Sequence, residues 1–367
     1  MLLTHLIKVH DRNRNERLWG IEACRGIAAL MVVFTHISQL NAQAWQSGVV
    51  DFQTSRLLLV GRTGVDFFFV LSGFIIYYIH KVDFDKPEKL YDFTIKRISR
   101  LVPAYWICTG LFVLLTIFSP TVTGREQDIT VIIRSILFIP QPDGPVIGVG
   151  WTLEHEVFFY FMFGLMIFSR KLGLIVWSIW IGVIAWRYMI GPIPHPYRYD
   201  WLGFQAQFII GMLVAELTLR GWLRYSLIAV CIGSAGFFFG FLMEWLEVYR
   251  TNSTYGKLTF GISSGILIYG VVGMDLYRKW NVPIFLRTLG DSTYSLYLIH
   301  GMIIILMGEI LEKIKLYALL HEFGSIAIVV SSCIIAAIIF TRIVEKPGIH
   351  LLRSLLEPRR SAASRSQ

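Results

Sequence analysis

The chain has 367 residues, of which 55% are hydrophobic and only 16% are charged, whereas a typical soluble domain has about 25% charged residues. A water-soluble fold could not cover so much apolar surface, so the composition excludes a soluble domain. The formal net charge of +9 does not indicate a nucleic-acid-binding protein, because lysine and arginine are sorted among alternate loops rather than gathered in one patch.

Long apolar runs recur along the chain. Their length of about 17 to 22 residues is what a helix needs to cross a hydrocarbon core about 30 Å thick. The predicted fold class is therefore all-α, a polytopic integral membrane protein with about ten transmembrane helices. The predicted spans are 21–40, 60–80, 101–119, 151–169, 172–190, 203–219, 225–245, 256–273, 292–311 and 323–342.

The loops between these spans differ in their content of basic residues. Lysine and arginine are frequent before the first span, between spans two and three, and from Arg342 onward, and they are sparse in the alternate loops. The positive-inside rule then predicts that both termini and the 81–100 loop are cytoplasmic and that 41–59 and 120–150 are outside. The predicted organisation is a cytoplasmic arm over 1–20, one transmembrane domain over 21–342 and a cytoplasmic tail over 343–367, with the oligomeric state left open.

The residues that usually bind metals or phosphate lack the spacing of a known site. The four cysteines (Cys24, Cys108, Cys231 and Cys333) all lie in apolar segments, without disulfide or metal-ligand spacing. A Gly-rich phosphate loop, a zinc signature and a nucleophile elbow are also missing from the sequence. The sequence therefore predicts no metal.

Two ionisable residues interrupt the first span. Arg25 and His36 are eleven residues apart, which is within about 20° of whole helical turns, so they share one helix face and are separated by about 16 Å. With the N-terminus inside, Arg25 lies near the cytoplasmic end and His36 in the outer half. Ionisable side chains at such depths are costly, and each one is a candidate functional group.

Three other spans place polar groups near the depth of His36. Asp66 lies about 9 Å below the outer surface in span two, Glu156 lies in the first turns of span four, and His300 lies near mid-depth in span nine. Of the neighbours of Glu156, we expect Glu154 and His155 to face water at the mouth of the helix.

Such a cluster suits proton abstraction from a hydroxyl group. Imidazole titrates near neutrality, and a carboxylate beside it orients the ring and stabilises its charged form. Asp66 or Glu156 would have that role beside His36. The alternative is that these groups only hydrogen-bond one helix to another.

A basic pair opens span three. Arg97 and Arg100 are three residues apart, so they are neighbours on one helix face. Guanidinium groups donate two parallel hydrogen bonds to phosphate oxygens, and the pair is a candidate phosphate site. The alternative is an ordinary basic cluster at the cytoplasmic surface or a contact with lipid headgroups.

Five motifs occur in order along nearly the whole chain. They are Arg25-Gly26-Ile27-Ala28-Ala29-Leu30 through His36, Gly64-Val65-Asp66 with Leu71-Ser72-Gly73-Phe74, Arg97 with Arg100, Gly150-Trp151-Thr152-Leu153 with Glu156 and Tyr160, and Gly290 through His300. Together they resemble the acyltransferase-3 family of membrane acyltransferases. The version Gly-Trp-Thr-Leu, followed by Phe158-Phe159-Tyr160, is most similar to the branch that modifies bacterial exopolysaccharides and related exported oligosaccharides, although His155 departs from that pattern.

The resemblance implies an O-acyltransferase that uses cytoplasmic acetyl-CoA as its donor. The phosphates of acetyl-CoA would lie near Arg97 and Arg100, and Arg25 would guide the acyl arm inward. His36 would be the catalytic base or a transient acyl carrier.

The resemblance also implies an acceptor and a location. The acetyl group would pass to a hydroxyl of a glycan or lipid-linked oligosaccharide, with Trp151, Tyr294 and His300 binding the acceptor or supporting the fold. The protein would lie among lipids in the bacterial cytoplasmic (inner) membrane. The alternative from another class is a transporter or flippase of a lipid-linked glycan, because buried charges also mark transport paths.

Overall fold

The computed structural model describes residues 17–44, 58–118, 124–190, 201–250, 253–277 and 280–356, and every regular element in these ranges is a helix. The long helices are α2 (Trp19–Ala44), α4 (Gly64–His80), α5 (Glu88–Phe118), α7 (Trp151–Phe168), α8 (Arg170–Ile190), α9 (Trp201–Leu219), α10 (Ser226–Trp245), α11 (Thr254–Tyr277), α13 (Thr293–Lys313) and α14 (Leu316–Phe340). The shorter helices are α6 (Ile129–Ile136), α12 (Ile284–Asp291) and α15 (Lys346–Leu356), with 3₁₀ turns at Val60–Thr63, Lys81–Asp83, Gly124–Gln127 and Gly148–Gly150 and a π turn at Thr341–Glu345. The predicted all-α class is confirmed for the described residues.

Each of the ten predicted spans overlaps one long helix, although α5 and α14 begin well before the spans predicted at 101–119 and 323–342. Within the described ranges, seven helices are long and apolar enough to cross a membrane, and α9 is apolar but shorter. Helix α7 is not among the seven, and its first turns contain Glu154, His155 and Glu156. The structure therefore supports a membrane protein with several spanning helices, and the count of about ten stays a prediction.

The outward side chains of the long helices are apolar. On α10, Leu227, Ile228 and Phe238 are all exposed, and α8 exposes Ile175 and Ile179 in the same way. In water this surface would favour aggregation, but against lipid tails it carries no such cost. These helices are therefore suited to a hydrocarbon surrounding.

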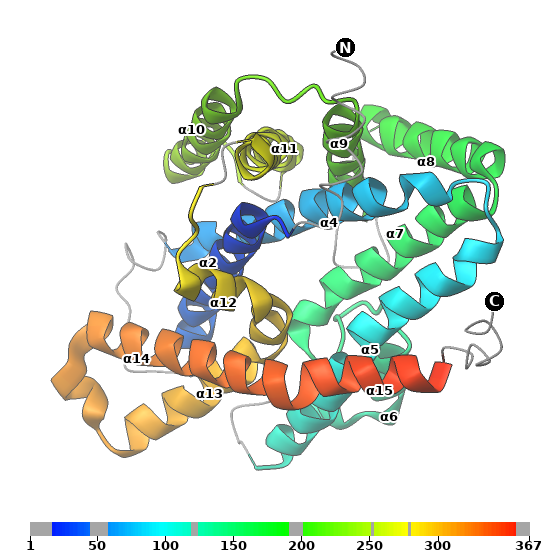
Figure 1. The fold of residues 1–367 in the computed structure, drawn as a ribbon. Coiled ribbons are helices and arrows are strands. Elements are labelled where there is room, and N and C mark those ends of the chain that lie inside the picture. The colour runs from blue at the N-terminus through cyan, green and yellow to red at the C-terminus, as the bar shows by residue number, and fades with distance from the viewer. Residues whose placement is uncertain are drawn as a thin grey trace.

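Helix α4 stands between two apolar cores. Phe69 and Ile76 pack into a cluster with side chains from α2, α5, α7, α9, α13 and α14. Phe67 and Phe74 belong to a second cluster, which includes residues of α2, α9 and α11. Figure 1 shows the corresponding arrangement, with α9, α10 and α11 grouped on one side of α4 and α12, α13 and α14 grouped near α2.

Helices α4 and α9 approach so closely that only glycine fits at their contact. A Cβ atom on Gly73 would overlap the carbonyl oxygen of Phe208, and one on Gly211 would overlap the carbonyl oxygen of Val70. Small residues let helix backbones pack tightly where lipid supplies no hydrophobic driving force. The contact holds α4, and with it the side chains of α4 that face the centre of the protein, in a set position.

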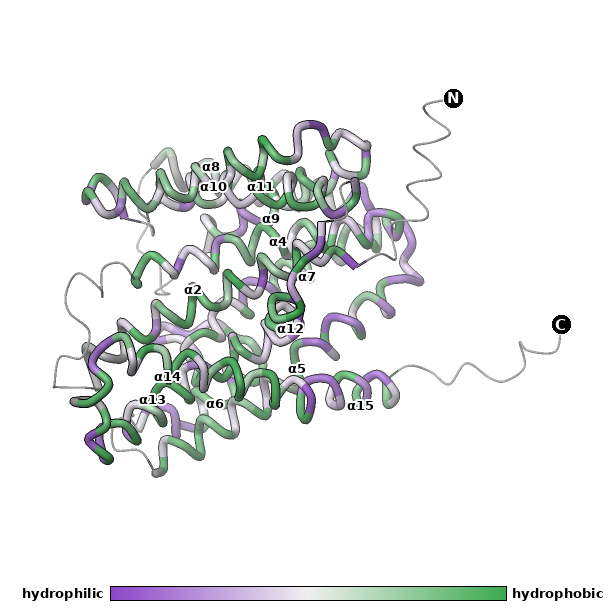
Figure 2. Tube along the Cα trace, turned by 60° about the vertical axis from the view of Figure 1, so that its left-hand side comes forward, coloured by the Kyte–Doolittle hydropathy of each residue, from purple (hydrophilic) through white to green (hydrophobic). Residues whose placement is uncertain are grey.

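Segments predicted to be cytoplasmic contact one another on one side of the protein. Lys81 pairs with Glu216 at the end of α9, and the backbone N–H of Arg170 donates to Asp85 at 2.7 Å. The helix α15 packs on α5, where Arg353 Nε donates to Ser99 Oγ at 3.1 Å. Figure 2 shows hydrophilic stretches along α15 and the neighbouring part of α5. The basic loops thus share a side, and its assignment to the cytoplasm stays a prediction.

Candidate active site

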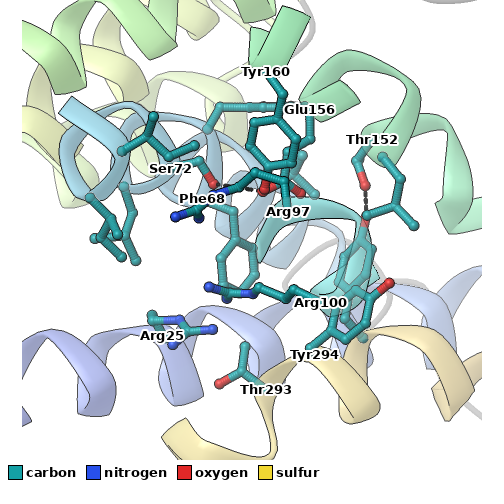
Figure 3. Close-up of a pocket in the computed structure, with 17 residues that line it drawn as sticks. Arg25, Phe68, Ser72, Arg97, Arg100, Thr152, Glu156, Tyr160, Thr293 and Tyr294 are labelled. Carbon is teal, nitrogen blue, oxygen red and sulfur yellow. Dashed lines mark hydrogen bonds between the residues drawn. The ribbon is translucent and has the colours of Figure 1, made fainter. Parts of the chain in front are cut away.

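A cavity opens at the centre of the protein between α2, α4, α5, α7 and α13. Its empty volume, including the open mouth, is about 760 Å³. Figure 3 shows Arg25, Arg97 and Arg100 directed toward a shared space, with Glu156 and Tyr160 above it and Thr293 and Tyr294 below. The lining residues are Arg25, Val65, Phe68, Phe69, Leu71, Ser72, Ile75, Ile76, Arg97, Arg100, Thr152, Leu153, Glu156, Tyr160, Thr293, Tyr294 and Tyr297. We call this space the arginine cavity.

The three guanidinium groups of the arginine cavity differ in their partners. Arg25 Nη1 donates to Glu22 Oε2 at 2.8 Å, within one turn of α2. Arg97 Nη2 lies 3.1 Å from His80 Nε2. Arg100 makes no hydrogen bond or ion pair in the described part of the chain, and the carboxylates of Glu156, Glu345 and Glu22 act on it only from a distance. Its donors are thus available to an anion.

Glu156 lies in the arginine cavity with one of its carboxylate oxygens already hydrogen-bonded. Tyr160 donates to its Oε1 from the next turn of α7, and Ser72 Oγ of α4 donates to the same atom at 3.5 Å. These bonds hold Glu156 beside Arg97 and Arg100 without a direct ion pair to either. The carboxylate therefore only partly offsets the positive charge of the cavity.

The far wall of the arginine cavity is built by tyrosines of α13. Tyr294 OH donates to the carbonyl oxygen of Leu101 at 2.8 Å, and the hydroxyls of Tyr297 and Thr152 are 2.8 Å apart. The Tyr297 ring also lies 6.0 Å, between centroids, from the ring of His300. Tyr297 thus separates the arginine cavity from the two histidines predicted as site residues.

His36 and His300 form a pair. The Nδ1 of His36 lies 3.3 Å from the Nε2 of His300, and the ring centroids are 4.8 Å apart. His300 is fully buried, and His36 is half-buried. We call these two residues the histidine pair.

The hydrogen bonds of the histidine pair determine where the protons lie in the neutral state. His36 Nδ1 is 2.9 Å from the carbonyl oxygen of Val32, and His300 Nδ1 is 3.0 Å from that of Leu296. A carbonyl oxygen only accepts, so both Nδ1 atoms carry hydrogen. His300 Nε2 is then an acceptor facing His36, and the Nε2 of His36 keeps its lone pair without a hydrogen-bond partner among the described residues.

Asp66 is directed away from the histidine pair. Gln207 Nε2 on α9 donates to Asp66 Oδ1 at 2.5 Å, and the carboxylate is buried. Within the described residues neither Asp66 nor Glu156 hydrogen-bonds His36. The sequence analysis placed Asp66, Glu156 and His300 near the depth of His36. Of these three, only His300 contacts the imidazole of His36 in the structure.

Two side chains in the first turn of α7 are buried, whereas the sequence analysis expected them to face water. Glu154 is only 5% exposed and His155 only 1% exposed, so the prediction that they face water is wrong. His155 packs edge-on against Phe69 and Trp151, with ring centroids 5.7 and 5.5 Å apart. Trp151 belongs to this aromatic cluster rather than to the lining of the arginine cavity.

Several site residues were not selected from the sequence. Ser72, Thr152 and Tyr297 all lie within the motifs, which was a usable signal, whereas the i, i+3 spacing of Glu22 and Arg25 would have predicted their ion pair. The role of His80 could not be predicted from the sequence, because its partners Asp83 and Arg97 lie in the following turn and in the next helix. In the described residues no group of three or more His, Cys, Asp or Glu side chains could hold a metal ion.

A family model described as an acyltransferase domain matches residues 18–342. The chain belongs to the acyltransferase-3 family. The match spans every helix that lines the arginine cavity and both members of the histidine pair. All five motifs contribute to the lining, through Arg25, Ser72, Arg97, Arg100, Glu156 and Tyr294.

The chain is similar to proteins named for exopolysaccharide production and for O-acetyl transfer. It is 29% identical over 265 residues to the exopolysaccharide production protein ExoZ of Rhizobium meliloti, covering 68% of this chain and 78% of ExoZ. It is 26% identical over 149 residues to the peptidoglycan O-acetyltransferase OatA of Listeria monocytogenes, covering 40% of this chain and 20% of OatA. A putative O-acetyltransferase of Staphylococcus aureus is 24% identical over 292 residues, which is 76% of this chain and 38% of the relative. No solved structure matches.

Proposed function

We propose that this acyltransferase transfers an acetyl group from cytoplasmic acetyl-CoA to a hydroxyl of an exported or lipid-linked glycan, such as an exopolysaccharide, an O-antigen or a lipo-oligosaccharide. The observation that carries the proposal is the position of the arginine cavity beside the histidine pair, with Tyr297 between them. One region suits a polyanionic donor, and the other suits removal of a proton.

The charge of the arginine cavity favours a phosphorylated donor. Three guanidinium groups line it, Arg100 has no hydrogen-bond partner among the described residues, and the nearby Glu156 is held by Tyr160 and Ser72. Guanidinium groups bind phosphate oxygens through paired, charge-assisted hydrogen bonds. Arg97 and Arg100 would hold phosphates of acetyl-CoA, and Arg25 would contact the acyl-bearing arm.

Helix α2 connects the donor site with the reacting centre. Arg25 lines the arginine cavity, and His36 lies about 16 Å farther along the same helix face. A flexible thioester arm anchored at the arginines would pass Tyr297 to reach His36. The two motif residues of α2 would therefore mark the two ends of the bound donor.

His36 would act through its free Nε2 lone pair. The imidazole takes the proton of the acceptor hydroxyl as its oxygen forms a bond to the thioester carbon, and the carbon–sulfur bond then breaks. The leaving thiolate takes the proton back from His36, so atoms and charge balance and free coenzyme A is released. The same lone pair suits a transient acyl carrier, which would leave a label on the protein.

The acceptor assignment rests on the motifs and on the relatives. ExoZ is named for exopolysaccharide production and OatA for peptidoglycan O-acetylation, and both names point to hydroxyls of surface glycans. Trp151 and Tyr294 would act at the acceptor side indirectly, through the aromatic cluster and the wall of the cavity. The bacterial cytoplasmic membrane is the proposed location, with lipid around the apolar helices.

Membrane assays test the proposed function. Inverted membranes that contain the protein should transfer radiolabel from acetyl-CoA to glycan, and the glycan of a deletion strain should lose the mass of one acetyl group per modified repeat. Glycan movement across the membrane without label transfer would instead support the transporter alternative. Label that stays on the protein in the absence of acceptor would make His36 an acyl carrier.

The proposed topology has its own test. Single cysteines at Lys86 and Asp143, both exposed in the structure, should be labelled from opposite sides of the membrane, with Lys86→Cys accessible from the cytoplasm. Labelling of both from the outside would contradict a cytoplasmic donor site.

A further inference from the structure

Arg97 of the arginine cavity is held by a histidine rather than by a carboxylate. Its Nη2 atom lies 3.1 Å from His80 Nε2, at the end of α4. On the other side of the ring, His80 Nδ1 lies 2.7 Å from Asp83 Oδ2. The 3₁₀ turn Lys81–Asp83 that follows α4 brings this carboxylate under the imidazole. Asp83, His80 and Arg97 thus form a continuous chain of hydrogen bonds.

Only one form of His80 satisfies both contacts. A guanidinium group only donates, so Nε2 of His80 must be an acceptor, and an ionised carboxylate only accepts, so Nδ1 must carry hydrogen. His80 is therefore neutral when both bonds exist, with its proton on the Asp83 side. The ring can meet Arg97 only as an acceptor.

Packing holds the chain of hydrogen bonds in place. His80 is 4% exposed and Arg97 is 9% exposed. The Phe93 ring lies edge-on to His80, with centroids 5.1 Å apart, and the Arg97 guanidinium lies over the rings of Phe93 and Tyr160 at 5.6 and 5.7 Å. Buried polar groups that have no other hydrogen-bond partners within reach keep one geometry.

Arg25 gives the contrasting arrangement in the same cavity. A carboxylate, Glu22, contacts Arg25 directly and offsets its charge. His80 directs Arg97 without contributing a negative charge at the contact. The charge of Asp83 is one side chain farther away, and Glu156 acts on Arg97 without a direct ion pair. A guanidinium group that is oriented without a direct ion pair keeps its charge-assisted donors for an incoming anion.

We propose that His80, directed by Asp83, is a positioning residue that holds Arg97 in the arginine cavity with its charge available to the phosphates of the donor. This inference rests on the proposed function, because it assigns the donor to that cavity. His80 does not line the cavity, so its effect passes through Arg97.

Two substitutions separate the two bonds of His80. In His80→Gln, the amide oxygen takes the place of Nε2 and keeps an acceptor for Arg97. In His80→Asn, the shorter amide keeps only the contact with Asp83. His80→Asn should weaken coenzyme A binding to the purified full-length protein about tenfold, as expected for one charge-assisted hydrogen bond, and His80→Gln should restore most of the affinity. The exposed His350, changed to Asn, is the matched control that should bind as wild type does.

The decisive measurement is a double-mutant cycle with Arg97→Ala. If His80 acts through Arg97, His80→Asn should change the coenzyme A affinity less than about twofold once Arg97 is Ala. In turnover, His80→Asn should raise the apparent KM for acetyl-CoA while kcat and thermal stability stay near wild type, which a purely structural role would not produce.

The outcomes distinguish this inference from the proposed function. If Arg97→Ala weakens binding but His80→Asn does not, or if the two effects multiply independently, His80 has no positioning role and the donor site stands. If Arg97→Ala leaves coenzyme A binding unchanged, the donor site itself is refuted. Weakening by both single variants without further loss in the double variant supports the inference.

Discussion

The arginine cavity and the histidine pair lie on either side of Tyr297, and their polar groups are satisfied in different ways. In the arginine cavity, the described residues provide Arg100 with no hydrogen-bond acceptor, and Arg97 is held by a neutral ring. In the histidine pair, both Nδ1 atoms donate to carbonyl oxygens of their own helices. Among the described residues, the arginine cavity thus has hydrogen-bond donors without an acceptor, and the histidine pair has the lone pair of His36 Nε2 without a donor.

This difference separates binding from chemistry. Charged donors that face open space add affinity for a polyanion but do not move protons. A neutral imidazole held in one tautomer adds little affinity, but its free nitrogen is ready to accept a proton. Substitutions in the arginine cavity should therefore act mainly on donor affinity, and substitutions in the histidine pair mainly on the rate.

The largest expected effect is that of His36→Gln. Removal of the proposed base should lower kcat about 10²- to 10⁴-fold, the range typical of general-base groups, while coenzyme A binding stays near wild type. The measurement is glycan acetylation by purified protein at saturating acetyl-CoA, with His350→Gln on α15 as the matched control. Activity within a few-fold of wild type would remove His36 from the mechanism.

The next effect is on donor affinity. Arg100→Ala removes a charge-assisted hydrogen bond to phosphate worth about 1.5–3 kcal/mol, so coenzyme A should bind about ten- to a hundredfold more weakly. Equilibrium binding to the detergent-solubilised protein measures this, and kcat should fall much less. The exposed Arg342, changed to Ala, is the control. Unchanged affinity in Arg100→Ala would leave the basic pair as part of the ordinary positive charge of a cytoplasmic surface.

The long helices could be predicted because bilayer thickness limits their length. Each of the ten apolar runs coincides with a helix. The shorter helices α6 and α12 were missed, as was the start of α5 at Glu88, before the predicted span at 101, because no such length limit applies there. The part of α5 before the predicted span packs on another segment instead, since Arg353 of α15 donates to Ser99 there.

Only part of the site could be predicted. The sequence gives the depth of a residue along its helix, but it does not give the direction in which the side chain points. The rise per residue placed Asp66 near the level of His36, but it could not show that Asp66 faces Gln207 on α9. Arg25, Arg97 and Arg100 do line one cavity. This could be predicted, because all three were expected near the cytoplasmic side and all three belong to the motifs. The partner of His36 required knowing that α13 packs beside α2.

A smaller effect is expected at His300. His300→Leu removes the Nε2 acceptor for His36, but the carbonyl oxygen of Val32 still receives the Nδ1 hydrogen. Loss of one neutral hydrogen bond, about 0.5–1.5 kcal/mol, should lower kcat by up to about tenfold. His300→Gln keeps an acceptor and should be less affected. A loss as large as that of His36→Gln would instead make His300 the base.

The smallest effect is expected for Asp66→Asn, and it tests whether the carboxylate belongs with the histidine pair at all. The Gln207 amide can donate to the Asn oxygen as it does to Asp66 Oδ1, and it also donates to the carbonyl oxygen of Lys257 at 3.2 Å. The buried hydrogen bonds are therefore kept, and kcat should stay within a few-fold of wild type. Asp66→Ala, by contrast, removes the acceptor and should lower stability by about 1–3 kcal/mol. Thermal unfolding and acetylation rates of the two variants, measured together, separate these effects. If Asp66→Asn lost as much activity as His36→Gln at unchanged stability, Asp66 would have to orient the imidazole through a contact formed only with substrate bound.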